Sequence, residues 1–164
     1  MKTLCTMFTA AVLLLGVAST VSAQSVNGHA HTLTRDFPSG PDEARITFVA
    51  VTLKDGTVVG HAKVKFLRND VRLKIDIDCL LVSENFATLS GVITHSNDPS
   101  LINNHVFFAV GDEVEDANSN DLITRLFYIP FPVPPNELCE LVGIPPRNAF
   151  FFPLGSDDVI RVRP

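Results

Sequence analysis

Apolar and polar residues alternate along most of the chain after residue 24, with the period of two that half-buried β-strands show. The alternation is clearest from Val71 to Val82, where apolar side chains at odd positions are separated by Arg72, Lys74, Asp76 and Asp78. One face of this strand is therefore expected in the core, with Cys79 on it, and the other face in solvent.

The same pattern predicts strands throughout, separated by clusters of Gly, Asn, Asp and Pro, and no long stretch has helical periodicity. The strands are expected near residues 28–34, 44–53, 57–68, 71–82, 86–95, 104–111, 122–130, 148–153 and 158–163. Residues 130–153 hold seven of the eleven prolines. Because proline cannot donate to a β-ladder, this segment is predicted to run over the surface or to cover a barrel end.

Two hairpins have a predicted register. Lys54-Asp55-Gly56 suits a three-residue loop with Gly in the left-handed conformation, which pairs Ile46 with Val64 and Phe48 with Ala62. A tight turn at Asn69-Asp70 then predicts a second set of pairs, Val64 with Ile75 and Phe66 with Leu73 inside, and Lys63 with Asp76 and His61 with Asp78 outside. The outer face would therefore carry a solvated ladder of ion pairs, which contributes little stability.

An antiparallel meander must bury its apolar face against a second sheet or close on itself. The predicted class is all-β, an antiparallel β-sandwich or flattened barrel of about 8–9 strands built from consecutive hairpins. The chain has no Trp, which counts against an immunoglobulin domain.

The first 23 residues have the pattern of a secretory signal peptide. A positive start, Met1-Lys2-Thr3, precedes a short apolar run over residues 10–18, and Val21-Ser22-Ala23 supplies the small residues of a cleavage site before Gln24. The apolar run is short for a membrane span, and no later segment approaches the roughly 20 residues that a span needs. We expect an exported single β-domain, residues 24–164, without a transmembrane segment.

Composition narrows the classes of partner. The formal net charge is −5, which argues against nucleic acid as a partner and against docking on anionic lipid. A protein or surface partner is expected instead.

Export also changes the interpretation of the cysteines. Cys5 leaves with the signal peptide, so Cys79 and Cys139 remain as an even pair in an oxidising compartment. A disulfide between them would close a loop of about 60 residues and contribute roughly 4 kcal/mol in the chain-entropy model. The alternative is two free thiols, one of them buried.

The acidic segment 112–121 is the best candidate for a binding site. Its carboxylates are hard oxygen ligands in a loop between strands, and such loops hold Ca²⁺ where calcium is near millimolar outside cells. The candidate ligands are Asp112, Glu113, Glu115, Asp116 and Asp121. The alternative is a solvated acidic loop that keeps a sheet edge soluble. No cofactor other than this calcium is expected.

Two other constellations have a weaker basis. Asp76 and Asp78 share a strand face at a spacing of roughly 6.7 Å, which glycosidase carboxylates also use, but Lys63 and His61 are their expected partners. His29 and His31 could contribute to a metal site with another histidine, whereas ordinary surface histidines are the simpler interpretation. No residue is assigned a catalytic role.

Several segments are similar to a family of small secreted bacterial β-rich domains of uncharacterised function. The stretch with the sequence DIDCLLVSENFATLSGVITHS resembles the middle of these proteins. The matching pieces are Lys54-Asp55-Gly56, Ile77 to Val82, Asn85 to Ile93, Phe108 to Asp112 and Asp121-Leu122-Ile123. The resemblance implies a secreted β-rich domain and implies no reaction.

These observations predict an exported, non-catalytic β-domain that acts by binding, as a surface or envelope interaction module. A lipocalin-like barrel that carries a small apolar ligand is the alternative, supported by the twelve Phe residues. A secreted hydrolase ranks third.

Overall fold

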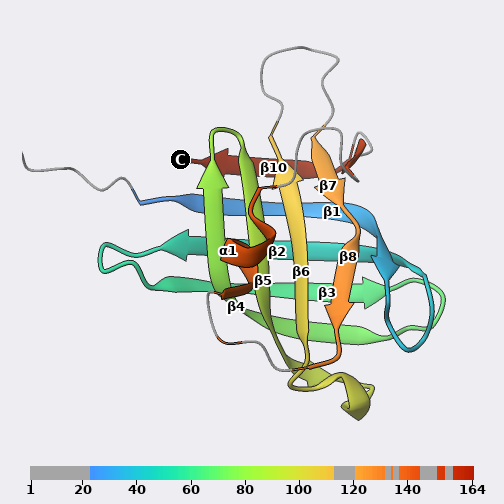
Figure 1. Cartoon of the computed structure of the whole chain (residues 1–164). Coiled ribbons are helices and arrows are strands. Elements are labelled where there is room, and N and C mark those ends of the chain that lie inside the picture. Colours follow the sequence, from blue (N-terminus) through green and yellow to red (C-terminus); the bar gives the residue numbers. More distant parts are fainter. Residues whose placement is uncertain (1–22, 113–120, 132–133, 135–136, 145–150, 154–156) are drawn as a thin grey trace, which may run out of the picture.

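The protein is an all-β barrel with one short helix on its surface (Figure 1). The computed structural model describes residues 23–112, 121–131, 134, 137–144, 151–153 and 157–164. The strands are β1 (Ser25–Arg35), β2 (Glu43–Thr52), β3 (Val58–Phe66), β4 (Arg72–Ser83), β5 (Phe86–Ser96), β6 (His105–Gly111), β7 (Leu122–Thr124), β8 (Leu126–Ile129), β9 (Phe151–Pro153) and β10 (Val159–Arg163). A 3₁₀ turn spans Pro99–Leu101, and α1 spans Glu137–Val142.

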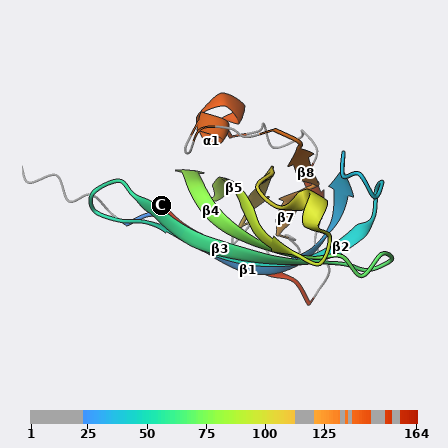
Figure 2. The same cartoon turned by 90° about the horizontal axis from the view of Figure 1, so that it is seen from below.

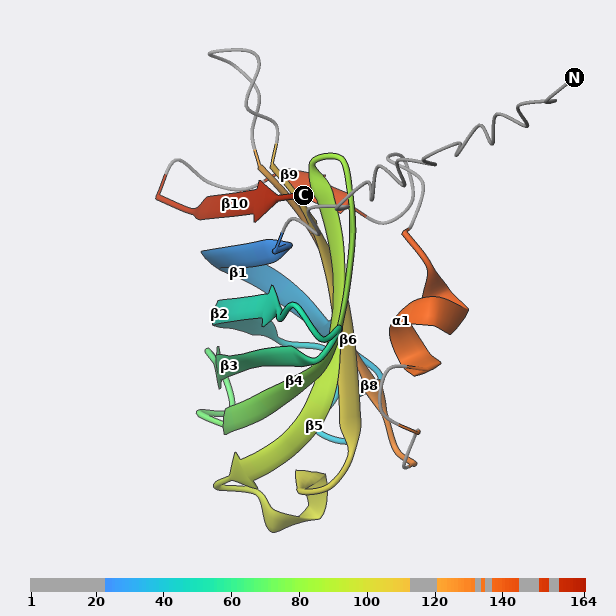
Figure 3. The same cartoon turned by 90° about the vertical axis from the view of Figure 1, so that its left-hand side faces the viewer.

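Seven strands close into a ring. β1 to β6 pair consecutively and antiparallel, and β8 then pairs antiparallel with β6 and parallel with β1 (Figure 3). β10 extends the sheet beside β1, and β7 and β9 extend it beside β6. The expectation of an all-β flattened barrel built from consecutive hairpins is confirmed.

Aromatic side chains occupy much of the barrel interior. Phe37 contacts Phe66 and Tyr128, with both ring-centroid distances 4.9 Å, and Phe48 contacts Phe108 at 5.2 Å. All five rings are buried, so the alternation of the strands directs a continuous apolar face inward.

The predicted register is right for one hairpin and wrong for the next. Ile46 lies opposite Val64 and Phe48 opposite Ala62, as predicted, and Gly56 in the loop has φ +84°. In the β3–β4 hairpin, however, Val64 lies opposite Leu73 rather than Ile75.

The loop length explains this error. The backbone N–H of Phe66 donates to the carbonyl of Val71 at 2.8 Å, so the connection is the four residues 67–70 and not a two-residue turn. The register is consequently shifted by two residues. Because side chains alternate with a period of two, every residue of β4 up to Ile77, where its pairing with β3 ends, keeps its predicted face and changes only its cross-strand partner.

The predicted disulfide between Cys79 and Cys139 is present, with the two Cα atoms 5.9 Å apart. The expectation that Cys79 faces the core is wrong. The β4–β5 register shifts between Ile77 and Cys79, which leaves Asp78 as the extra residue of a β-bulge. Beyond the bulge the alternation is inverted: Leu80 belongs to the core cluster, and Cys79 points outward toward α1.

α1 covers the outer face of β4 and β5 (Figure 2), where residues 137–144 run over the surface as predicted for the proline-rich segment. The helix itself was not predicted, because six residues are too few to show helical periodicity. Leu138 and Cys139 are buried, and Gly143 ends the helix at φ +65°, its N–H donating to the carbonyl of Cys139.

Candidate functional site

Basic side chains gather on the outer face of β2, β3 and β4. A groove of about 560 Å³ lies over these strands, and we call it the basic groove. Its lining contains five Lys and Arg side chains and no acidic one: Arg45, Lys63, Lys65, Arg72 and Lys74. Alternation turns all five outward, because their neighbours on the same strands fill the core.

The strand register arranges these cations in two rows. In the first row Arg45 lies opposite Lys65, which in turn lies opposite Arg72. In the second row Lys63 lies directly opposite Lys74. Adjacent strands are roughly 4.8 Å apart, so the charges form a compact grid.

The positive charge is only partly compensated. Asp70 contacts Lys65 at 3.7 Å and Arg72 at 3.2 Å. Within the described part of the chain, neither Lys63 nor Lys74 forms an ion pair, although like charges directly opposite each other destabilise a sheet. The predicted pairing of Lys63 with Asp76 is wrong, since Asp76 lies opposite His61.

Four of the five histidines lie exposed on this same outer face: His29, His31, His61 and His95. His29 donates a hydrogen bond through Nε2 to the backbone carbonyl of Asp157, at 2.7 Å. His31 lies 3.0 Å from Asp158 through Nδ1, and Arg45 donates to its Nε2 at 2.8 Å. Among the described residues, no group of three or more His, Cys, Asp or Glu side chains could hold a metal ion.

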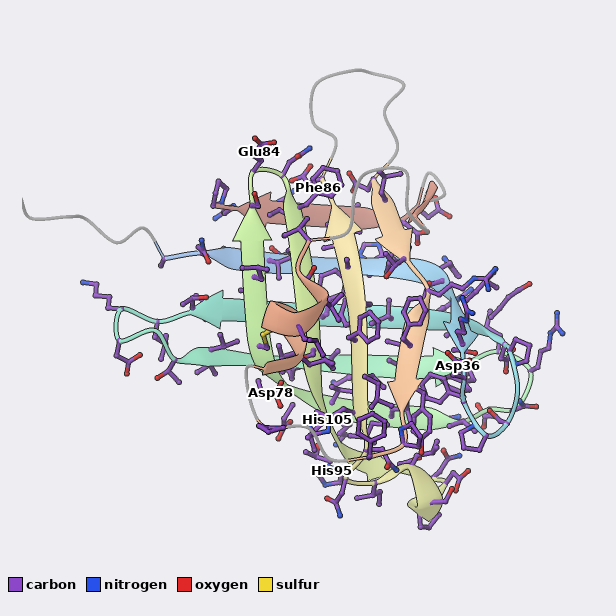
Figure 4. All side chains as sticks on the ribbon, in the orientation of Figure 1. Asp36, Asp78, Glu84, Phe86, His95 and His105 are labelled. Carbon is purple, nitrogen blue, oxygen red and sulfur yellow. A yellow bond between two sulfur atoms is a disulfide. The ribbon has the colours of Figure 1, made fainter. Side chains whose placement is uncertain are left out.

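The predicted pair of carboxylates takes two different environments. Thr94 donates to Asp76 at 3.5 Å on the exposed face. Asp78, at the bulge, accepts from the Ser90 hydroxyl at 3.3 Å and lies 3.5 Å from Nε2 of His105 (Figure 4). In this arrangement the carboxylate stands between the serine and the histidine, so the histidine is not placed to take the serine proton.

Two of the predicted calcium ligands hold β10 by hydrogen bonds to its backbone. Asp121 accepts a hydrogen bond from the backbone N–H of Ile160 at 2.6 Å, and Asp112 accepts one from Val162 at 3.1 Å. Their carboxylates therefore accept hydrogen bonds from the backbone of β10, at the place where β10 contacts β6. Glu113, Glu115 and Asp116 lie outside the described residues.

A scan against models of protein families found no match, and neither did searches of curated proteins and of solved structures. In the described part of the chain no helix is long and apolar enough to cross a membrane.

Sequence reasoning placed the cations of the basic groove on the solvent side but did not recognise them as a site. The predicted register paired them with aspartates, and the whole-chain charge of −5 indicated an acidic protein. Net charge is a sum over the whole chain and does not show where the charges lie. The two rows bring together five of its thirteen basic residues.

Proposed function

We propose that this chain is an exported, non-catalytic binding domain whose basic groove binds an acidic polysaccharide. The observation that carries the proposal is the row in which Lys63 opposes Lys74 without a carboxylate partner among the described residues. Such a repulsive pair is most stable when an anion lies between the two ammonium groups. Clusters of Lys and Arg of this kind suit polymers that carry sulfate or carboxylate groups at close spacing.

The lining of the groove favours this class of partner over others. Histidine supplies its only aromatic ring, so single-stranded nucleic acid would lack the stacking platforms that it normally uses. Protein–protein interfaces are depleted of Lys, and three of the five cations here are Lys. No exposed Phe or Leu lines the groove, although membrane-surface binding combines such side chains with basic ones.

Side-chain packing inside the barrel favours a binding site on the outer surface over a ligand carried in the interior. Inside the barrel Phe37 contacts Phe66 and Tyr128, and Phe48 contacts Phe108. A lipocalin-like carrier would need an apolar cavity at that place. Export is part of the proposal, and it rests on the residues that precede Gln24.

Titration calorimetry with dextran sulfate at low ionic strength tests the proposal. The variant Lys63→Gln/Lys74→Gln should bind at least about fivefold more weakly, and the affinity of the wild type should fall as salt is added. Lys54→Gln is the matched control, because Lys54 is an exposed lysine at the β2–β3 loop, outside the groove lining.

Three results would overturn the proposal. The wild type could fail to bind dextran sulfate, or the double variant could bind as tightly as the wild type. Tighter binding to duplex DNA or to vesicles of phosphatidylglycerol than to the polysaccharide would assign the groove to another class of partner.

A further inference from the structure

The histidines of the outer face are arranged around the cations of the basic groove. One continuous row of cross-strand neighbours runs from β1 to β5: His29, Thr47, Lys63, Lys74 and His95. The Lys63–Lys74 pair thus has a histidine toward each end of its own row. His31 lies opposite Arg45 in the neighbouring row, and His61 lies opposite Asp76 in the next row on the other side.

We propose that the basic groove is a pH-dependent site, at which protonation of His29 and His95 strengthens the binding of an acidic polysaccharide as the pH falls below neutral. This inference rests on the proposed function. Histidine is the side chain that ordinarily gains its positive charge between about pH 8 and pH 5. Two added charges would extend the line of cations from two strands to four.

The charged groups around each histidine determine which histidines make the binding depend on pH. His31 faces the carboxylate of Asp158, and His61 faces that of Asp76, so a proton on either is offset by a neighbouring negative charge. His29 faces Thr47 on β2, Val159 on β10 and the carbonyl of Asp157. The charged residues that line the same surface hollows as His29 are Arg45, Lys63, Asp157, Asp158 and Arg161, and within the described part of the chain none of them forms an ion pair with it. His95 faces Lys74 on β4 and the hydroxyl of Thr94.

Proton binding and anion binding at such a site are reciprocal. An anion held by Lys63 and Lys74 favours the charged form of the nearby His29 and His95, and the charged form in turn favours the anion. Binding of a polysaccharide near pH 6.5 should therefore take up protons from the buffer. Asp70 lies 3.7 Å from Lys65 and 3.2 Å from Arg72, in the row beside that of Lys63 and Lys74.

Calorimetry with dextran sulfate at pH 7.5 and pH 5.5, at equal ionic strength, tests the inference. The sulfates of this probe stay ionised at both values, so a change in affinity reports on the protein. We expect about five- to tenfold tighter binding at pH 5.5, since each added charge contributes a modest attraction at an exposed site. Titrations near pH 6.5 in two buffers of different ionisation enthalpy should show proton uptake.

Two matched variants locate the effect. His29→Gln/His95→Gln should bind as the wild type does at pH 7.5 and lose most of the gain at pH 5.5. His31→Gln/His61→Gln should keep most of it, because those histidines face carboxylates. All four positions are exposed, so both variants are expected to fold.

The outcomes separate this inference from the proposed function. Binding at pH 7.5 without tightening at pH 5.5, or tightening that persists in His29→Gln/His95→Gln, would overturn the pH dependence and leave the binding function standing. The absence of binding at both pH values would overturn the proposed function, and the inference with it.

Discussion

Lys63 on β3 lies directly opposite Lys74 on β4, on the outer face of a barrel whose chain is acidic overall. A like-charge pair at directly opposed positions costs stability by roughly 0.2–1 kcal/mol. Departures from local rules of this kind are expected where a protein has a function to perform. The pair therefore couples the stability of the sheet to the binding proposed for the groove.

Replacing one lysine of the pair with an acidic residue should separate these two effects. Lys74→Glu places opposite charges across the strands, so we expect the free energy of unfolding to rise by about 0.3–1 kcal/mol. The same change should weaken dextran sulfate binding more than Lys74→Gln does. Urea denaturation and calorimetry on the two variants measure both quantities, and a lower stability for Lys74→Glu than for Lys74→Gln would contradict the prediction.

The disulfide should hold α1 on the barrel. Apart from Cys139 itself, Leu138 is the buried apolar side chain of the helix among those described, and Thr88 donates to the carbonyl of Gly143 at 2.8 Å. The variant Cys79→Ala/Cys139→Ala should therefore lose about 2–4 kcal/mol of stability. Hydrogen exchange should rise in residues 137–144 before it rises in β1 to β6. Thr88→Val, which removes only the hydrogen bond, is the control and should cost about 1 kcal/mol. Uniform exchange across helix and barrel would contradict this expectation.

The Asp121 carboxylate should contribute to stability by holding β10 against the barrel. Asp121→Ala leaves the N–H of Ile160 without its acceptor, and we expect a loss of about 1–3 kcal/mol. Asp121→Asn keeps an acceptor oxygen and should lose less. The measurement is thermal unfolding in the presence of a chelator, so that calcium plays no part.

Repeating that experiment with millimolar calcium tests the calcium site predicted from the acidic segment. Binding of calcium to the native state would raise the Tm of the wild type according to its affinity, and Asp121→Ala would lose that rise. Equal stability of Asp121→Ala and the wild type in the chelator would show that the hydrogen bond from the N–H of Ile160 to Asp121 does not stabilise the protein.

The only tyrosine of the chain offers a spectroscopic check of the interior. Burial, and to a smaller extent the negative charge of Asp98, raises the pKa of Tyr128 above its ordinary value of 10.0. Absorbance titration should show a midpoint above 10 in the native protein and near 10 in denaturant. Because the pKa is higher in the folded state, the corresponding stability is present below about pH 10 and is lost as the pH rises past it. An identical midpoint in both states would contradict the burial of this ring.

The sequence predicted β1 to β3 and the first half of β4 well because each has one buried and one exposed face. A side chain's face follows from alternation alone, so the outward direction of Lys63 and Lys74 could be predicted without any structure. Their cross-strand partners could not, because the partners depend on the length of the loop over residues 67–70. An error of two residues in that loop leaves every face unchanged and turns a repulsive pair into an apparent ion pair.

For Cys79, too, one feature could be predicted from the sequence and another depended on strand pairing. The expectation of export left an even pair of cysteines and favoured the pairing of Cys79 with Cys139, and the disulfide is present. The inversion of alternation at Asp78 was not predictable, because a bulge is defined by pairing with β5 and leaves no mark in the hydrophobic pattern of β4. The bulge places the disulfide on the outer face, where α1 covers Thr88 and Ser90.

The sequence by itself determined the fold class, the approximate strands, the face of each side chain before the bulge and the pair of cysteines, because these follow from local periodicity and composition. The tertiary structure alone decided the closure of the ring through β8, the register of β3 against β4, and the gathering of cations and histidines from strands β1 to β5 on one face. Those features depend on pairing between distant segments, and pairing is governed by loop geometry and packing that no local pattern of residues encodes.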